Sequence, residues 1–234
     1  WVELGGSASA DGLSNSSGAG IEPSIVASGT GANSAEIVAW SDNRNGIYEI
    51  YVARYAGGSW QQLAGSAQGE GVSNSSVDSR RPSITLDASG NPVVAWTQVS
   101  GATSNIFAAK YDPTANGGAG GWVALGSSLS SSGLSASGHA DNAQIVNTSA
   151  GLVVAWLDTS SGHANVFARQ FNGTAWVALG SGADSWTGIT GSSVNIPGFS
   201  LAANGTVEAI AWTQPGTTAG NSIFLKQNSG SGWT

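Results

Sequence analysis

The chain has 234 residues, of which 14 are acidic and 7 are Lys or Arg, so its net charge is −7. Proteins that bind nucleic acid or anionic lipid need a basic surface to neutralise phosphates, and this composition excludes both as expected partners. No Cys is present, which excludes disulfides and thiolate metal sites. No stretch of 18 apolar residues occurs, so we expect no membrane insertion. The 40% hydrophobic residues and 10 Trp nevertheless provide enough apolar surface for a folded core.

The first repeat contains four short strand patterns separated by turn sequences. The turns are rich in Gly, Asn and Ser, and no apolar spacing follows a helix. The run at residues 36–41 is β-branched, which suits a strand buried on both faces. In chain order the four patterns cover residues 1–4, 23–27, 36–41 and 48–55.

Two markers repeat along the chain. A hexapeptide with Ala-Trp at its third and fourth positions recurs along the chain. Its tryptophans are Trp40, Trp96, Trp156 and Trp212, at intervals of 56, 60 and 56 residues. A Trp-x-x-Leu or Trp-x-x-Leu-Gly segment alternates with it, beginning at Trp1, Trp60, Trp122 and Trp176, and a fifth copy starts at Trp233. Fixed periods of this length indicate a repeat architecture. We therefore expect one domain over residues 1–234, made of repeats 1–59, 60–121, 122–175 and 176–234.

Four short antiparallel strands in each repeat predict an all-β chain, a β-propeller with four visible four-stranded blades. The strand that begins at Pro23 should lie nearest the propeller axis. The chain begins on an outer strand, so the segment from Trp1 can complete the last blade, whereas Trp233-Thr234 competes for the same position. A larger ring of five to eight blades, or closure by oligomerisation, stays open.

The repeats resemble Trp-rich bacterial β-propeller repeats. The likeness rests on segments such as Val153–Asp158, which read Val-Val-Ala-Trp-x-Asp, and on a closing Gly-x-x-Trp, as at Gly57 to Trp60 and Gly173 to Trp176. Such repeats share a distant likeness with sialidase-like and lectin-like propellers, which implies a secreted or cell-surface microbial protein. The Asp-box of sialidases is not intact, because residues 41–46 have the wrong spacing.

Alternating strand directions place the long polar connectors and the turns after the Ala-Trp strands on one loop-rich face, where we expect any site. Trp186 lies on such a connector, outside the repeated positions, and could stack against a sugar ring or cover a blade edge. The position two residues after each Ala-Trp tryptophan is polar and could contact a ligand or cap its own turn. The candidate ligand-binding residues are Trp186, Asp42, Arg44, Gln98, Asp158, Gln214, Arg80 and Arg81.

No motif nominates catalytic residues. The chain lacks a nucleophile elbow and a phosphate-binding loop, and no motif selects two of the 14 acids as a pair. A sialidase needs several converging Arg, and the five Arg give no indication of this. His139 and His163 have no metal-ligand spacing. We therefore expect no enzyme activity, no metal and no cofactor.

The sequence leads to three functional hypotheses. The first is a non-catalytic binding or adhesion module, secreted or on the cell surface, that binds a glycan or a protein through the loop-rich face. The second is a structural, self-assembling propeller unit, which leaves homo-oligomerisation open. The third is a sialidase-like glycoside hydrolase.

Overall fold

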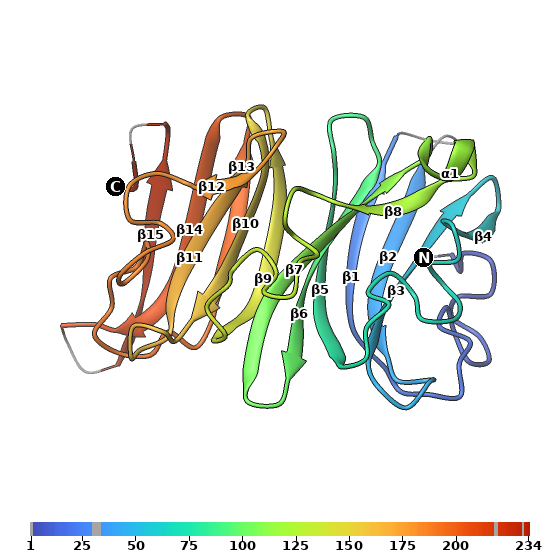
Figure 1. The fold of residues 1–234 in the computed structure, drawn as a ribbon, viewed down its shortest axis with the longest axis horizontal. Helices are drawn as coiled ribbons and strands as arrows, with labels where there is room; N and C mark the ends of the chain where they lie inside the picture. Colours follow the sequence, from blue (N-terminus) through green and yellow to red (C-terminus); the bar gives the residue numbers. More distant parts are fainter. Residues whose placement is uncertain (1, 30–33, 218–219, 231) are drawn as a thin grey trace.

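The structure is a computed structural model that describes residues 2–29, 34–217, 220–230 and 232–234. Four antiparallel sheets stand side by side, each built from consecutive strands, and each sheet is one blade (Figure 1). The prediction of an all-β propeller with four blades is confirmed. Among the described residues, no helix has the length and apolar character needed to cross a membrane.

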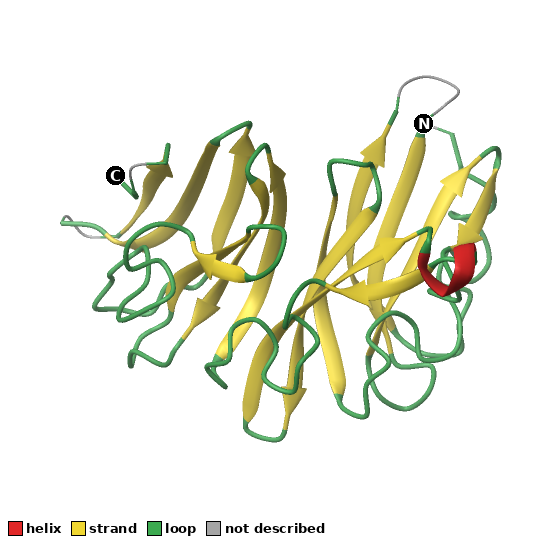
Figure 2. Cartoon of the chain, turned by 45° about the horizontal axis from the view of Figure 1, so that its top comes forward, coloured by secondary structure: helices red, strands yellow, loops and turns green. Residues whose placement is uncertain are grey.

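The blades follow the repeats of the sequence. The first blade contains β1 (Gly20–Ser28), β2 (Ala35–Asp42), β3 (Glu49–Ala56) and β4 (Ser59–Gln62). The second contains β5 (Asp78–Leu86), β6 (Pro92–Ser100), β7 (Thr103–Asp112) and β8 (Gly121–Ala124). The third contains β9 (Ala140–Thr148), β10 (Gly151–Asp158), β11 (Asn165–Phe171) and β12 (Trp176–Ala178). The fourth contains β13 (Phe199–Asn204), β14 (Val207–Pro215) and β15 (Asn221–Asn228). The short α1 (Ala115–Gly118) is a turn between β7 and β8 that contains residues with positive φ (Figure 2).

The fourth blade receives the start of its outer strand from the last described residues. Trp233 forms a β-bridge with Asn228, and Thr234 exchanges two backbone hydrogen bonds of 2.9 Å with Gln227. Residues 2–4 are not in a strand, and Trp1 lies outside the described residues. Of the two options for the outer strand, the described residues adopt the one that uses Trp233.

The first strand of each blade lies on the inner side, as predicted for the strand at Pro23. β1 contacts β5, β5 contacts β9, and β9 contacts β13. The first and fourth blades stand at opposite ends of the row (Figures 1 and 2). The four described blades therefore form an open row and not a closed ring.

The core consists of three similar layers between neighbouring blades. Alternate residues of a strand point to opposite faces of its blade, so that Val93 and Ala95 of β6 pack against Val154 and Trp156 of β10. The same contact recurs between the first and second blades and between the third and fourth. The Ala-Trp tryptophans are 5%, 0%, 2% and 5% exposed at Trp40, Trp96, Trp156 and Trp212. All four are core residues that pack within the hydrophobic clusters.

The tryptophans of the second marker link one outer strand to the next. The indole N–H of Trp60 donates to the backbone oxygen of Leu4 at 2.7 Å, and that of Trp122 donates to Leu63 at 2.9 Å. Trp176 and Trp233 repeat this bond to Leu125 and Leu179 at 2.8 and 2.7 Å. Each Trp-x-x-Leu segment thus provides the acceptor for the tryptophan of the following segment, which explains why both residue types recur.

Candidate functional site

A β-bulge interrupts the first strand of each of the first three blades, near the loop-rich face. The strand register shifts at residues 21–24 of β1, at 80–83 of β5 and at 141–144 of β9. At equivalent positions in these bulges, Glu22, Arg81 and Asn142 have φ values of +56°, +55° and +55°. Non-glycine residues at positive φ cost roughly 1–3 kcal/mol each and concentrate at functional sites, and bulges redirect side chains beside active sites. Because three blades carry such a residue at the same position of the inner strand, this position is a candidate for a functional site.

The bulges bring two carboxylates onto one guanidinium. The backbone amide of Arg81 donates to Glu22 Oε2 at 2.8 Å, and Arg81 Nε lies 3.7 Å from Glu22 Oε1. On its other side, Arg81 Nη1 forms an ion pair with Asp141 Oδ2. Because Glu22, Arg81 and Asp141 come from three different blades, only the folded propeller places them together. We call these three residues the bulge triad.

Each carboxylate of the bulge triad has further hydrogen-bond donors. Thr97 Oγ1 donates to Asp141 Oδ1 at 3.2 Å, and the amide of Asn142 donates to the same oxygen at 2.8 Å. Ser41 Oγ donates to Glu22 Oε2 at 3.2 Å. The hydrogen bond to Asp141 raises the pKa of Arg81 above its ordinary value, so the guanidinium remains a cation. The triad is therefore a fixed cation between two supported carboxylates.

The bulge triad is accessible to a ligand. A hollow of about 200 Å³ lies beside it, lined by Arg80, Arg81, Thr97, Asp141 and the turn at 101–104. The Arg81 and Asp141 side chains are 47% and 44% exposed, and Glu22 is 29% exposed. Of the triad, Arg81 and Asp141 line the hollow, whereas Glu22 is not among its lining residues. A few polar groups that converge on a concave surface are typical of a small-molecule site.

The Arg80-Arg81 doublet divides between two environments. Arg81 belongs to the triad, whereas Arg80 Nη2 pairs with Asp78 Oδ2 at 3.1 Å. The Arg80 guanidinium also lies 3.8 Å from the ring centre of Tyr48, whose amide donates to Asp78 Oδ1 at 2.9 Å. Arg80 thus lines the hollow, but the carboxylate of Asp78 neutralises its charge.

The polar positions after the Ala-Trp tryptophans serve mainly their own strands. Asp158 Oδ2 accepts the indole N–H of Trp156 at 3.2 Å. Gln214 accepts that of Trp212 at 2.9 Å. In the second blade Gln98 does not take this role, and the buried Trp96 N–H has no hydrogen-bond partner among the described residues. Asp158 Oδ1 also accepts the Ser160 amide at 2.9 Å, so the capping alternative accounts for Asp158. Gln214 bonds the indole instead, and the ligand contacts of both residues stay predictions.

Asp42 is part of a buried polar cluster with Arg44. Its Oδ2 lies 3.4 Å from the Trp40 indole nitrogen, which donates to it, and 2.9 Å from Arg44 Nη2. Arg44 also covers the ring of Tyr51 at 4.0 Å. Burial alone would raise the pKa of Asp42, but hydrogen bonds from Arg44 and Ser16 outweigh it and hold this pKa below its ordinary value. Arg44 and Asp42 thus neutralise each other.

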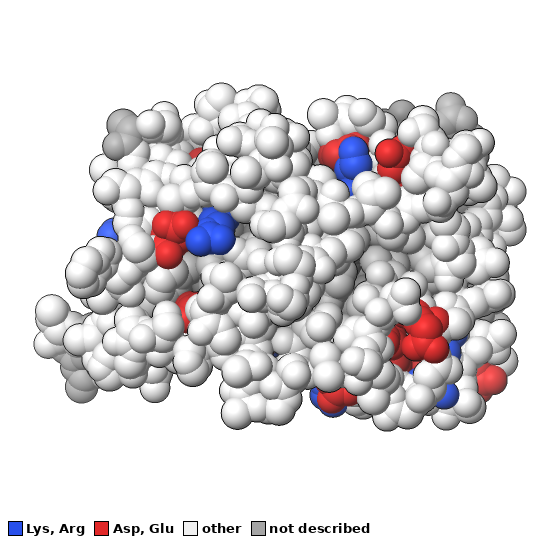
Figure 3. Space-filling model, viewed as in Figure 1, with Lys and Arg blue, Asp and Glu red and all other residues white. Residues whose placement is uncertain are grey.

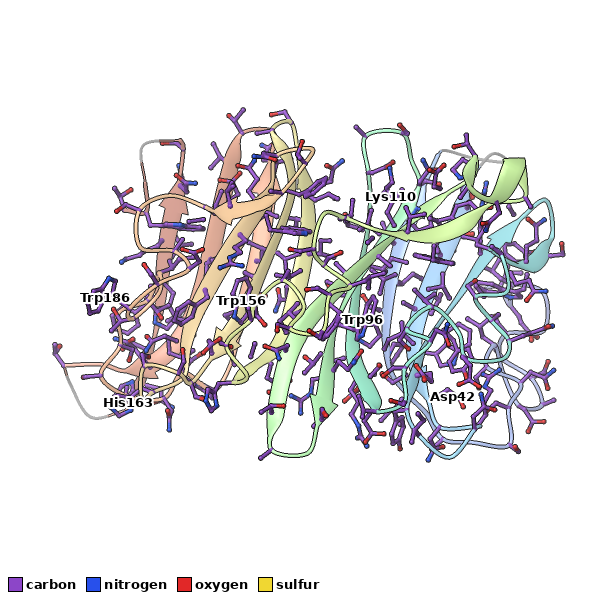
Figure 4. The ribbon with its side chains drawn as sticks, viewed as in Figure 1. Asp42, Trp96, Lys110, Trp156, His163 and Trp186 are labelled. Carbon is purple, nitrogen blue, oxygen red and sulfur yellow. The ribbon has the colours of Figure 1, made fainter. Side chains whose placement is uncertain are left out.

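Trp186 is 86% exposed and lies on the connector between the third and fourth blades. Its backbone has a positive φ of +56°. Asp42 and Trp186 lie at opposite ends of the molecule (Figure 4), so the structure does not bring these two candidates together. A role of Trp186 as a stacking platform stays a prediction.

Two buried acids have raised pKa values but a structural role. Burial raises the pKa of Glu49 despite hydrogen bonds from Ser73 and Ser75, and burial also raises that of Glu208. At the position of Glu49, the second and third blades carry Asn105 and Asn165. Both asparagines accept the same kind of bonds from the following connector. Glu49 therefore holds its connector as Asn105 and Asn165 hold theirs, which indicates a structural role.

Sequence reasoning missed Glu22 and Asp141. Only comparison of the repeats at the position just before Pro23 and Pro82 would have shown that one column holds Glu22, Arg81 and Asn142. Within the part of the chain that the structure describes, no group of three or more His, Cys, Asp or Glu could hold a metal ion.

No family model and no curated protein matches this sequence. Solved structures share its fold, and two of them are the following. Zg3597, a family 117 glycoside hydrolase from the marine bacterium Zobellia galactanivorans, is 10% identical, with 95% of this chain and 70% of that chain covered and a TM-score of 0.53. A thermostable family 43 glycoside hydrolase is 10% identical, with 89% and 71% covered and a TM-score of 0.52. At this identity the likeness concerns the fold.

These neighbours contradict the two main functional expectations drawn from the sequence. We expected a non-catalytic binding module without enzyme activity, with a self-assembling unit as the alternative, whereas both neighbours are glycoside hydrolases on a propeller of the same shape. The sequence search was limited to local motifs, which cannot detect residues that separate repeats bring together. In this fold the residues at the inner strands come from separate repeats, and only their meeting in space marks them.

Proposed function

We propose that this chain is a glycan-processing enzyme, a glycoside hydrolase whose carboxylate pair is Glu22 and Asp141. The bulge triad is the observation that carries this proposal, because Glu22 and Arg81 at strained positions, and Asp141 beside the strained Asn142, place two carboxylates around one guanidinium. Glycoside hydrolysis requires two such carboxyl groups on either side of the scissile bond. The two propeller hydrolases with the same fold support the assignment.

The position of the pair relative to the hollow suggests a division of roles. Glu22 and Asp141 each accept two hydrogen bonds, but of the two only Asp141 is among the residues that line the hollow. We assign to Asp141 the role of nucleophile or base, which acts on the sugar or on a water molecule. Glu22 lies on the other side of Arg81 and would protonate the leaving oxygen. Arg81 is a positioning residue that keeps the two carboxylates apart.

The charges around the hollow favour a neutral glycan. Arg80 is paired with Asp78, and Arg81 is paired with both carboxylates of the triad. Neither cation is therefore available for the carboxylate of an acidic sugar. The face shown in Figure 3 is largely uncharged, with acidic and basic residues in small groups. We expect a substrate without charged groups.

Composition and resemblance support a location outside the cell. The chain has two Lys and no Cys and is rich in Ser, Asn and Gly, as in the Trp-rich bacterial propeller repeats that it resembles. A secreted or cell-surface hydrolase would meet its glycan there. Detection of the protein only inside intact cells would contradict this location.

The proposal is tested by incubating the purified protein with a panel of neutral polysaccharides and aryl glycosides, from acidic to neutral pH. We expect new reducing ends, or released phenol, from at least one member. Glu22→Gln is the matched control preparation, because a contaminating hydrolase would remain active in it. No release from any member by folded protein would overturn the proposal.

A further inference from the structure

In three of the four blades, a basic side chain donates to a backbone oxygen of the connector that enters the blade. These donor and acceptor pairs are Arg44 with Ser14 at 3.1 Å, Arg169 with Leu134, and Lys226 with Ile189 at 2.8 Å. Arg44 also bonds the Ala67 oxygen of the connector that leaves its blade, at 3.1 Å. Arg169 bonds Asp184 of its leaving connector at 2.9 Å. A cation therefore joins the two connectors of the first blade and of the third.

The second blade carries no cation at either position. The position that Arg169 and Lys226 occupy in the third strand of their blades is Ala109 in the second blade. The position of Arg44, four residues after the Ala-Trp tryptophan, is Ser100. Both residues are small and uncharged. The second blade therefore differs from the other three in the space between its connectors.

A hollow of about 490 Å³ lies between the two connectors of the second blade, and we call it the second-blade hollow. Its lining consists of residues 72–76 and 129–131 of the connectors, with Trp96, Gln98, Phe107 and Trp122 of the strands. All of these residues are uncharged, and the connectors contribute five serines and one asparagine. Its volume lies within the roughly 300–1,000 Å³ that is usual for small-molecule sites.

Two polar groups at this hollow do not bond each other. In the fourth blade, Gln214 accepts the indole N–H of Trp212 at 2.9 Å. In the second blade, Gln98 lines the hollow instead, and the buried Trp96 N–H has no partner among the described residues. A buried N–H without an acceptor costs about 1–3 kcal/mol. A polar ligand in the hollow can supply this acceptor, with the Gln98 amide beside it.

We propose that the second-blade hollow binds a sugar unit of a neutral glycan. Serine hydroxyls and the Gln98 amide donate and accept hydrogen bonds, as sugar hydroxyls do. The rings of Phe107 and Trp122 add apolar surface for the carbon face of a sugar. No lining residue is charged, so a charged ligand would lose its hydration without gaining an ion pair. The choice of a glycan as ligand rests on the proposed function.

The second-blade hollow is separate from the bulge triad, although both lie on β6. Trp96 and Gln98 line the second-blade hollow, whereas Thr97 and Val99 line the hollow beside the triad. Alternate residues of a strand point to opposite faces of its sheet, so β6 stands between the two sites. A sugar unit in the second-blade hollow would hold a glycan on the enzyme without contacting the proposed catalytic carboxylates.

An NMR titration with cellohexaose, xylohexaose and mannohexaose tests the proposal. Asp141→Asn is used for it, so that the proposed hydrolysis does not consume the saccharide. We expect at least one saccharide to shift the Trp96 indole resonance and the amide resonances of residues 72–76. Arginine amide, whose guanidinium resembles that of Arg44, should not shift them. If no saccharide shifts these resonances, or if arginine amide binds more tightly than every saccharide, the proposal is overturned.

Gln98→Ala removes the amide from the hollow and leaves the rest of its lining in place. We expect the saccharide to bind about tenfold more weakly, because about 1.4 kcal/mol is the range of one or two hydrogen bonds. Gln170→Ala is the matched control, because Gln170 is also half-buried but lies on β11, outside the hollow. Unchanged affinity in Gln98→Ala, or the same loss in both variants, would contradict the proposal.

Ala109→Arg fills the hollow in the way that Arg169 does in the third blade. We expect this variant to lose the saccharide shifts at residues 72–76 while it cleaves a small aryl glycoside at the wild-type rate. A folded Ala109→Arg that binds the saccharide as tightly as the wild type would overturn the proposal, and Gln98→Ala decides if Ala109→Arg does not fold. A wild type that cleaves no glycoside refutes the proposed function alone, because the saccharide shifts are measured without hydrolysis.

Discussion

The outer strands and the inner strands of this propeller use repetition in opposite ways. Along the outer strands, four tryptophan N–H groups donate to four leucine oxygens at nearly the same distance, so each repeat carries the same residues. At the inner-strand bulges, Glu22, Arg81 and Asn142 share one backbone conformation but differ in chemistry. The comparison teaches that conserved residue types within the repeats build the scaffold. A repeated backbone shape with different side chains builds a site.

In the scaffold, the substitution of a buried tryptophan should have the largest effect on stability. Trp156 is 2% exposed, stacks on Phe167 and donates to the buried Asp158. Trp156→Ala should lower the free energy of unfolding by about 3–5 kcal/mol, because it leaves a large cavity and an unpaired acceptor. Urea unfolding measures this. Trp186→Ala, at an exposed tryptophan, should change stability by less than about 0.5 kcal/mol, and a similar loss in both variants would contradict the account.

At the inner-strand bulges, the substitution of Arg81 should lower the proposed activity. Arg81→Gly keeps the left-handed backbone without strain and removes the cation between Glu22 and Asp141. We expect hydrolysis to fall roughly 10–100-fold and its pH profile to move to higher pH, because two carboxylates without a cation raise each other's pKa. The pH dependence of the rate measures the shift. Arg81→Lys, which restores a charge, should recover part of the profile, and an unshifted profile in Arg81→Gly would argue against the positioning role.

The loss of one hydrogen bond between a tryptophan N–H and a leucine oxygen of the outer strands should have a smaller effect. Trp122→Phe keeps an aromatic ring but removes the N–H that donates to the Leu63 oxygen at 2.9 Å. We expect a loss of about 1 kcal/mol, the usual net value of one hydrogen bond. Thermal unfolding measures it, with Trp186→Phe as the control. No loss would show that the recurring tryptophans serve packing alone.

The smallest effect should appear as a pH dependence at Glu49. Burial raises the pKa of Glu49 above its unfolded value, so between these two values the folded chain binds more protons and its stability falls as pH rises. Glu49→Gln removes this titration, and its stability relative to wild type should increase from acidic to neutral pH. Asp42→Asn should show the opposite trend, because the lowered pKa of Asp42 adds stability that is lost on acidification. Denaturant unfolding at several pH values measures both slopes, and equal slopes would refute the explanation.

Sequence patterns predicted much of the fold because packing repeats locally. The spacing of Trp40, Trp96, Trp156 and Trp212 gave the number of blades and the buried positions. The same reasoning could not find the triad, because Glu22 and Asp141 lie 119 residues apart and carry no motif. Of the predicted site residues, Arg81 belongs to the triad, whereas its two partners were not predicted because they depend on bulges that only the folded strands reveal.

The central claim is that Glu22 and Asp141 form the catalytic pair. Its most direct test is to compare wild type, Glu22→Gln and Asp141→Asn on the glycan that the wild type cleaves best. We predict that each variant loses more than about a hundredfold in rate while its unfolding temperature stays close to that of the wild type. A folded variant of either residue that hydrolyses this glycan at the wild-type rate would contradict the claim.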